Sequence, residues 1–175
     1  MESLPQLADG RQPATAQHLL KRLTELGLDA NTVEHPAVFT VEEAKANRGQ
    51  LTGCHTKNLF LRDKKGAMWL VVCLEDRKVD LRALAVLLGS GRLSFGSSRR
   101  LMENLGVIPG AVTPFAVIND RAGHVRLALD RAILEHEPLN FHPLINTMTT
   151  SIHADDFLAF LDAERHHPLL IDFSA

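Results

Sequence analysis

Two apolar, partly β-branched runs joined by a short polar turn constrain the fold of this sequence most. They cover residues 56–62 and 67–74, and the four residues between them are polar and end in glycine. Strand-forming runs around such a turn predict a β-hairpin. A second pair of runs, at 115–119 and 124–129, flanks a similar turn and predicts a second hairpin. Further strands are predicted at 31–33, 133–141 and 148–152.

Helical signals separate these strands. Apolar residues at helical spacing, or capping residues, predict helices over 13–26, 40–48, 80–89, 97–106 and 154–165. The second helix begins with a capping box, in which the Thr40 hydroxyl accepts the Glu43 amide and the Glu43 carboxylate reaches back. Asp80 can cap the third helix, and Ser97 or Ser98 can cap the fourth.

The order of these elements places hairpins among isolated helices. Such an order favours the α+β type of α/β architecture, with a mixed, largely antiparallel sheet flanked by helices, over a doubly wound parallel sheet. At about 150 residues per domain, a chain of 175 residues forms one domain. We assign this domain to residues 13–175, preceded by a flexible N-terminal arm at residues 1–12.

Composition excludes several classes of protein. With 45% hydrophobic residues and a formal charge of −2, the chain is not expected to be disordered. No apolar run approaches the ~20 residues of a membrane span, and the N-terminal residues lack the pattern of a secretion signal, so we expect a cytoplasmic protein without membrane contact. The near-zero charge argues against a non-specific nucleic-acid coat. One Trp and no Tyr argue against a broad base-stacking platform.

Familiar catalytic and metal motifs are missing from the sequence. Nine histidines form no recognised ligand spacing, so neither a metal nor another cofactor is expected. Cys54 and His55 are sequence neighbours that a strand would point to opposite faces, and Cys73 lies in a run typical of a core. A thiol nucleophile is therefore not expected, and no phosphate-binding or nucleophile-elbow motif is present.

Three segments remain as candidates for chemistry. Residues 56–58, Thr-Lys-Asn, concentrate hydrogen-bond donors at the start of a strand, although a lysine in such a pattern often points to solvent. Residues 106–114 contain two Gly and two Pro, and a rigid loop of this kind can present amide groups to an oxyanion or form a plain structural turn. Residues 140–150 carry a histidine before proline and a run of hydroxyl groups.

Four stretches at these positions resemble one known family. They are HPAVFTVEEA (35–44), HTKNLFLRDKKG (55–66), GVIPGAVTPFAVIND (106–120) and NFHPLINTMTTSI (140–152). Together they resemble the YbaK/prolyl-tRNA-synthetase-associated editing domains, and most closely their free-standing prolyl-tRNA deacylase (ProX or PrdX) branch. GAVTP, at 110–114, matches the GxxxP loop of that family.

The resemblance implies a trans-editing hydrolase with a curved mixed sheet. Its substrate would be alanine wrongly esterified to proline tRNA, and the ribose hydroxyl of the substrate would help to activate water. Backbone amides of Gly110, Ala111, Val112 and Thr113 would then stabilise the oxyanion. Lys57, at the position of the pocket lysine of the family, would position the acceptor end.

The resemblance also implies a substrate-binding pocket that selects by size. Exclusion of proline by a steric clash can discriminate between alanine and proline more strongly than recognition of one or two methylenes. The candidate wall consists of Val38, Phe39 and Thr40. Alternatively, Val38 and Phe39 are ordinary core residues. The other expected pocket residues are Asn58, Pro114, His142 and Asn146.

Basic residues on predicted surface elements are candidates for contact with tRNA phosphates, or are simply solvated charges. They are Lys45, Arg48, Arg62, Lys64, Lys65, Arg92, Arg99 and Arg100. The expected partners are the acceptor end of an aminoacylated proline tRNA and, transiently, prolyl-tRNA synthetase, with the protein a monomer or weak homodimer.

Two other functions stay open at this point. The protein could deacylate tRNA carrying cysteine or another small amino acid. It could also be a catalytically silent module that binds a tRNA acceptor end or a nucleotide. The presence of Lys57 together with the 110–114 loop favours an active enzyme.

Overall fold

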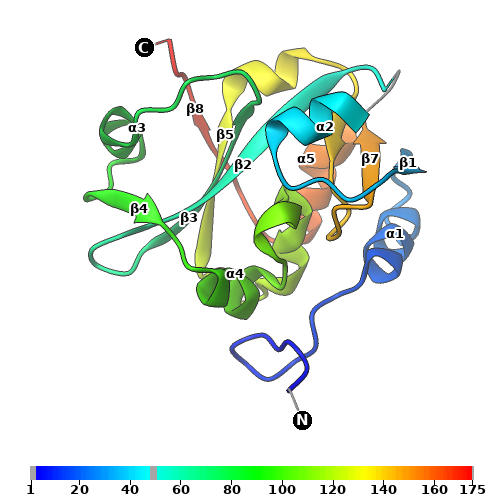
Figure 1. Cartoon of the computed structure of the whole chain (residues 1–175), viewed down its shortest axis with the longest axis horizontal. Coiled ribbons are helices and arrows are strands. Elements are labelled where there is room, and N and C mark those ends of the chain that lie inside the picture. The colour runs from blue at the N-terminus through cyan, green and yellow to red at the C-terminus, as the bar shows by residue number, and fades with distance from the viewer. Residues whose placement is uncertain (1–2, 48–50, 175) are drawn as a thin grey trace.

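The computed structural model describes residues 3–47 and 51–174, and its centre is one mixed eight-stranded sheet (Figure 1). The strands are β1 (Ala30–Glu34), β2 (Cys54–Asp63), β3 (Met68–Leu74), β4 (Leu93–Phe95), β5 (Val125–Asp130), β6 (Leu139–Phe141), β7 (Met148–Ile152) and β8 (Leu169–Ile171). Their order is β1-β7-β6-β2-β3-β5-β8, and β4 also pairs with β2. Four pairings are antiparallel and three are parallel, which confirms the predicted mixed sheet.

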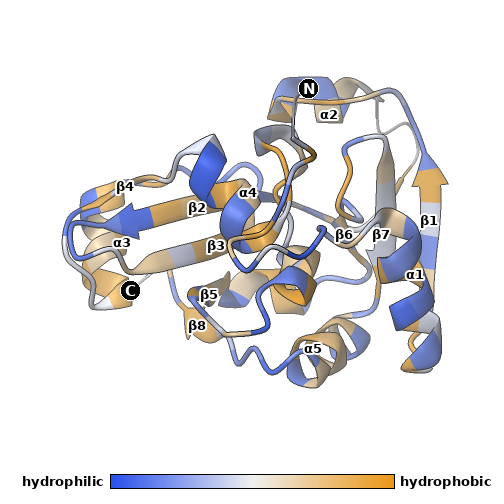
Figure 2. Cartoon of the chain, turned by 90° about the horizontal axis from the view of Figure 1, so that it is seen from below, coloured by the Kyte–Doolittle hydropathy of each residue, from blue (hydrophilic) through white to orange (hydrophobic). Residues whose placement is uncertain are grey.

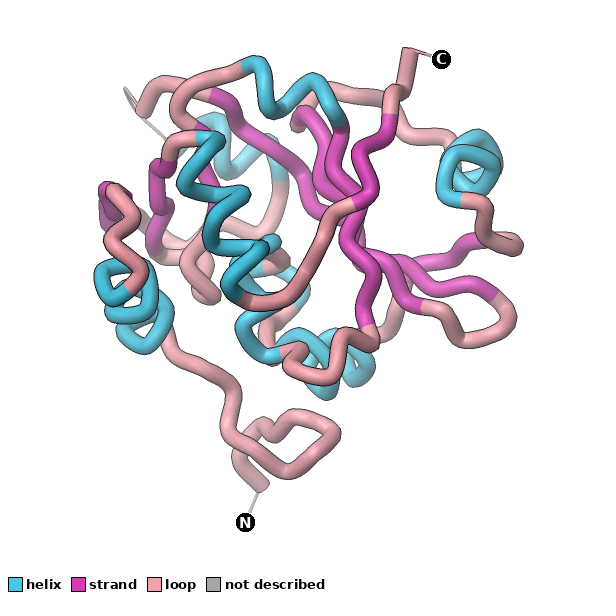
Figure 3. The backbone as a smooth tube through the Cα atoms, turned by 180° about the vertical axis from the view of Figure 1, so that it is seen from behind, coloured by secondary structure: helices cyan, strands magenta, loops and turns pink. Residues whose placement is uncertain are grey.

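Helices cover both faces of the sheet, and α5 lies in front of the sheet in Figure 3, which views the molecule from behind. The α-helices are α1 (Ala16–Glu25), α2 (Val41–Asn47), α3 (Leu81–Leu88), α4 (Ser98–Leu105) and α5 (Ala154–Ala163). Three short 3₁₀ helices are η1 (Pro109–Ala111), η2 (Pro114–Asn119) and η3 (Arg131–Glu135). Asp80 and Ser97 cap α3 and α4 as predicted. Thr40 accepts the Glu43 amide at 3.0 Å, but the Glu43 carboxylate bonds the Phe39 amide instead of that of Thr40.

Alternating residues of β2 and β3 divide the core into two clusters. Phe60, Leu70 and Val72 belong to the larger cluster, which includes residues of α1, α4 and α5. Leu61 and Val71 belong to a smaller cluster with residues of α3, β4 and β8. Figure 2 shows strong apolar colour along β3 and on α5. This alternation decides which polar side chains of β2 share a face, because strand neighbours point to opposite sides.

The second predicted hairpin and one predicted strand are wrong. Residues 115–119 lie in η2 and form no strand. β5 pairs in parallel with β3 instead of pairing with the segment that precedes it in the sequence. Pro114 at the first position of η2 favours a helical turn, and burial of the segment explains its apolar character. Likewise, most of 133–141 is not strand, because η3 occupies its beginning and β6 covers only Leu139–Phe141. β4 and β8 were not predicted.

The N-terminal segment packs on the body of the protein within its described residues. Leu7 is buried, and the Ala8 amide donates to the Glu103 carbonyl of α4 at 2.8 Å. Arg11 also donates to the Asn119 carbonyl at 3.2 Å. Leu7, Ala8 and Arg11 therefore contact the body of the protein, whereas residues 3–6 are exposed.

Candidate active site

One pocket contains three of the candidate site residues that the sequence singles out, Val38, Asn58 and His142. It lies between the segment before α2, the start of β2, and β6 and β7, with α2 beside the strands (Figure 1). Its volume is about 60 Å³. Twelve residues line it: His35, Val38, Ala44, Leu51, His55, Thr56, Asn58, Glu75, Asn140, Phe141, His142 and Thr149.

Two histidines in this pocket have fixed ring orientations. His35 bonds the Pro36 carbonyl through Nδ1 and the Thr149 hydroxyl through Nε2, both at 2.8 Å. His142 Nδ1 lies 2.8 Å from the Met148 carbonyl, and the two imidazole centroids are 5.9 Å apart. Because a carbonyl only accepts, Nδ1 of each ring carries a proton. In the neutral form of His142, Nε2 is then an acceptor.

Burial favours the neutral form of His142. Burial lowers the pKa of this imidazole, the hydrogen bond to Met148 opposes that effect, and the charge of His35 lowers the pKa further. The net pKa lies below the ordinary value of 6.5, so His142 is neutral at pH 7. A neutral imidazole with a free acceptor position on one nitrogen can take a hydrogen bond or a proton from a hydroxyl group.

Asn58 and Lys57 occupy opposite faces of β2. Asn58 lines the pocket, and its Oδ1 is buried without a hydrogen-bond partner among the described residues. An unpartnered buried amide oxygen is costly, and a donor entering the pocket would satisfy it. Lys57 does not line the pocket, and its ammonium group donates to the Arg77 carbonyl.

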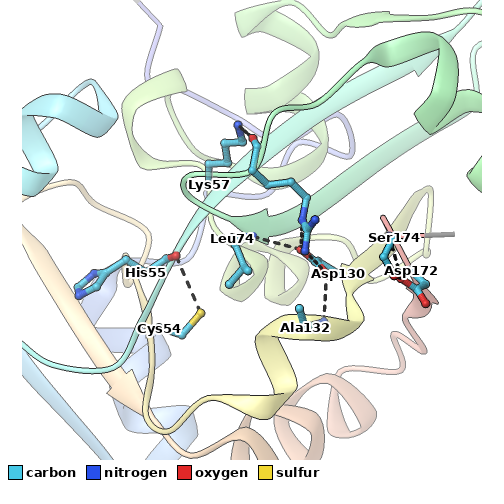
Figure 4. Close-up of polar contacts among 9 residues, drawn as sticks. Cys54, His55, Lys57, Leu74, Asp130, Ala132, Asp172 and Ser174 are labelled. Atoms are coloured by element: carbon cyan, nitrogen blue, oxygen red, sulfur yellow. Dashed lines mark hydrogen bonds and ion pairs between the residues drawn. The ribbon is translucent and has the colours of Figure 1, made fainter.

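Lys57 belongs to a polar cluster on the opposite face of the sheet (Figure 4). In this cluster Arg77 donates through Nε to the buried Asp130 at 2.6 Å. Asp130 also accepts the Leu74 amide at 3.4 Å and the Ala132 amide at 3.0 Å. The Lys57 contact therefore joins β2 to the turn that follows Glu75. Glu75 lines the pocket, and its amide donates to the His55 carbonyl at 3.1 Å.

The residues of the predicted oxyanion loop lie outside the pocket lining, and their amides are not equivalent. The Ala111 amide donates to the Ile108 carbonyl at 2.9 Å, and Ala111 is fully buried. Thr113 is also fully buried, and its hydroxyl caps η2 by accepting the Phe115 amide. Gly110 and Val112 are partly exposed. None of these residues belongs to the pocket lining.

Asn146 connects this loop with the pocket wall. Its Nδ2 donates to the Val38 carbonyl at 2.9 Å, and the Val38 amide donates to the Asn146 carbonyl at 3.3 Å. Val38 is buried and lines the pocket, whereas Phe39 is 65% exposed and Thr40 caps α2. Of the three residues predicted to form the wall, Val38 is the one that the pocket contains. Pro114 is buried in η2 and lies outside the lining.

The predicted tRNA-binding cations do not form a ring around the pocket. Lys45, on α2, forms an ion pair with Asp76 near the mouth. Arg62 and Lys64 lie at the far end of β2, six to eight residues beyond Thr56, which corresponds to roughly 20–26 Å of strand. Arg92 is exposed just before β4, which pairs with that same end of β2. Arg48 lies outside the described residues.

Several pocket residues were not proposed from the sequence. His35, Asn140 and Thr149 lie within the stretches that carry the family resemblance, but no local pattern sets them apart. Asn140 is held by the Thr52 and Cys54 carbonyls, to which its Nδ2 donates at 2.9 and 3.1 Å. The pairing of β2 with β6 and of β6 with β7 brings these residues together.

The described residues offer no metal cluster and no membrane-spanning helix. No three histidine, cysteine or acidic side chains among them are arranged to hold a metal ion. No helix in the same part of the chain is long and apolar enough to span a bilayer. Burial raises the pKa of both Cys54 and Cys73 to about 11, so neither thiol is ionised at pH 7.

Comparison with known proteins identifies relatives that cover most of this chain. A sequence model of the aminoacyl-tRNA editing domain matches residues 35–160. The chain is 43% identical over 160 residues to prolyl-tRNA synthetase associated domain-containing protein 1 of Bos taurus, covering 89% of this chain and 93% of that protein. It is 36% identical over 141 residues to the prolyl-tRNA editing protein ProX of Acetoanaerobium sticklandii, covering 80% and 86%.

A more distant relative and a solved structure complete the comparison. The multifunctional Ser/Thr-tRNA deacylase ProXp-y of Escherichia coli is 31% identical over 105 residues, covering 58% of this chain and 63% of that protein. A crystal structure described as a candidate trans-editing enzyme for prolyl tRNA synthetase shares the fold, with a TM-score of 0.67, 20% identity, and coverage of 91% and 98%. The chain therefore belongs to the aminoacyl-tRNA editing domain family and is a hydrolase that acts on aminoacyl-tRNA.

Proposed function

We propose that this protein removes alanine from mischarged proline tRNA in trans. The observation that carries the proposal is the small pocket of about 60 Å³ walled by the buried Val38. In this pocket we expect the methyl side chain of alanine to fit and the larger proline ring to clash with the wall. The name of the relative ProX, a prolyl-tRNA editing protein, supports proline tRNA as the carrier.

The aminoacyl group enters the pocket with its ammonium group toward β2. Asn58 offers the unpartnered Oδ1, and the Glu75 carboxylate lines the same pocket. An ammonium group supplies a donor for the Asn58 oxygen and complements the negative charge of Glu75, and a hydrogen bond to a charged group is worth about 1.5–3 kcal/mol. These two residues thereby orient the ester carbonyl.

Hydrolysis then requires a proton acceptor and oxyanion stabilisation. The Nε2 atom of the neutral His142 accepts from the ribose hydroxyl, which in turn helps to activate the attacking water. Backbone amides of the 110–113 loop stabilise the developing oxyanion. Gly110 and Val112 are the favoured donors because Ala111 and Thr113 are fully buried and the Ala111 amide is already bonded.

Lys57 contributes from outside the pocket. Its bond to the Arg77 carbonyl holds the turn that follows Glu75. Lys57→Ala is expected to lower kcat/KM for alanyl-tRNA by about 10- to 100-fold, because small displacements of substrate-positioning groups have effects of that size. Lys57→Arg, which keeps a donor, should retain most of the activity.

The matched control for Lys57 is Lys21→Ala, at an exposed lysine on α1. Single-turnover deacylation rates and melting temperatures of the three variants would be measured together. A folded Lys57→Ala protein with the rate of the control would remove Lys57 from the catalytic machinery.

The tRNA would approach along the basic residues of α2 and the β2–β3 hairpin. Lys45 lies near the mouth, and Arg62, Lys64 and Arg92 would meet phosphates farther along the acceptor stem. Because aminoacyl-tRNA is both substrate and translation intermediate, the proposed site of action is the cytoplasm, with transient association with prolyl-tRNA synthetase.

Deacylation of one tRNA carrying different amino acids tests this function. Proline tRNA would be charged separately with Ala, Pro, Ser, Thr and Cys, and loss of each ester followed against the spontaneous rate. We expect rapid loss of Ala and preservation of Pro. Preferred loss of Ser, Thr or Cys would replace alanine as the substrate, in line with the name of the relative ProXp-y. No loss of any ester would indicate a silent binding module.

A further inference from the structure

The pocket is too small for the whole end of a charged tRNA. Its volume of about 60 Å³ fits a small aminoacyl group. On the proposed function, on which this inference rests, the ester joins that group to the terminal adenosine. The adenine base must therefore lie outside the pocket, on a surface next to its wall.

Phe39 is an exposed aromatic residue beside that wall. It follows Val38, which lines the pocket, and is 65% exposed. Its amide donates to Glu43 Oε2 at 2.8 Å, and the preceding residue is held by two hydrogen bonds to Asn146. The backbone on both sides of the ring is thus fixed, although the side chain is largely uncovered.

Gly110 allows this ring to lie against the 106–114 loop. A Cβ atom at position 110 would lie 2.7 Å from Cδ1 and 3.3 Å from Cε1 of Phe39, and 3.1 Å from Nδ2 of Asn146. Any other residue would displace the ring edge or the wall. The glycine therefore has a packing function in addition to any use of its amide, and it leaves most of the ring surface open.

We propose that Phe39 is the platform on which the terminal adenine of the tRNA stacks while the aminoacyl ester occupies the pocket. Exposure of a large apolar ring to water is unfavourable, and a purine face covers it well. Stacking of this kind tolerates any base and contributes a measurable share of affinity per base. One phenylalanine suffices for one base, so the scarcity of aromatic residues in the chain does not oppose it.

A thermodynamic cycle that combines substitution of Phe39 with removal of the terminal base from the substrate tests this assignment. Two alanylated acceptor-stem hairpins of proline tRNA would be compared, one with its terminal adenine and one with an abasic terminal ribose. In the wild-type protein, loss of the base should lower kcat/KM by about 5- to 100-fold. Phe39→Ala should show the same loss on the adenine substrate and no further loss on the abasic one. Phe39→Trp should behave like the wild type.

Phe95→Ala is the matched control, because Phe95 is 63% exposed on β4. It should retain wild-type rates on both hairpins. Equal rates for Phe39→Ala and Phe95→Ala on the adenine substrate would overturn the stacking assignment. So would a base-removal effect that persists in full in Phe39→Ala. Failure of the proposed function would appear differently, as absence of hydrolysis by the wild-type protein itself.

Discussion

Replacing Asn58 by alanine is expected to slow hydrolysis of an alanyl ester by about 10- to 150-fold. That factor corresponds to the ~1.5–3 kcal/mol of a hydrogen bond to a charged group. Asn58 lines the pocket, and its buried Oδ1 has no partner among the described residues, so the substrate ammonium group would be its natural donor. The measurement is single-turnover deacylation of proline tRNA charged with alanine.

A second substrate separates contact with the ammonium group from general damage to the pocket. Lactyl-tRNA has a hydroxyl group in place of the ammonium group and nearly the same size. Wild-type protein should hydrolyse it more slowly than alanyl-tRNA, and Asn58→Ala should reduce that preference. Asn31→Ala, at an exposed asparagine on β1, is the control and should preserve it. An unchanged preference in Asn58→Ala would show that Asn58 does not contact the ammonium group.

Local sequence signals predicted those parts of the fold that local contacts determine. The hairpin of β2 and β3 depends on adjacent runs and a four-residue turn, and it was predicted well. The segment at 115–119 has the same apolar character because Phe115 and Val117 are buried, yet it is helical. Burial alone does not distinguish a strand from a buried 3₁₀ turn, and the parallel partner of β5 lies more than 50 residues away in the sequence.

In the candidate site, too, some residues could be predicted from local sequence and others depend on long-range packing. Val38, Asn58 and His142 were proposed from the sequence and line one pocket. Strand alternation implies that Lys57 and Asn58 point to opposite faces, but which face holds the pocket depends on the packing of the two core clusters. Asn140 joins the site only through strand pairings that no local motif encodes.

A buried ion pair between residues far apart in the sequence is expected to contribute strongly to the stability of the protein. His166 Nε2 lies 3.0 Å from Asp120 Oδ2, and both side chains are at most 5% exposed. Asp120 also accepts the amides of His124 and Val125 at 3.0 and 2.9 Å. The pair thus joins the segment after α5 to the turn before β5. The helix predicted over 154–165 ends just before His166, and no sequence signal links this histidine to residue 120.

Removal of one partner leaves the other buried and unpaired. Asp120→Ala is therefore expected to lower the free energy of unfolding by about 3–5 kcal/mol near pH 6. His166→Gln should also destabilise the protein, because the glutamine cannot supply the positive charge. Urea unfolding monitored by circular dichroism measures both effects. His167→Gln, at an exposed neighbour, is the control and should unfold like the wild type.

The pair should also give stability a characteristic pH dependence. Burial lowers the pKa of His166, but the hydrogen bonds to Asp120 and to the Glu164 carbonyl, with the negative charges of both residues, together outweigh it, and the net pKa is raised above 6.5. The contribution of His166 is then complete below pH 6.5 and is lost as the pH rises through the raised value.

For Asp120, burial raises the pKa, but the hydrogen bonds from His166, Val125 and His124 outweigh it, and the net pKa falls below 3.8. Its contribution is complete above pH 3.8 and is lost as the pH falls through the lowered value. The stability difference between wild type and His166→Gln should thus be largest between about pH 4 and 6.5 and shrink on either side. A difference that stays constant from pH 3 to 9 would show that the pair acts by packing alone, because only an ionised pair couples folding to protons in this way.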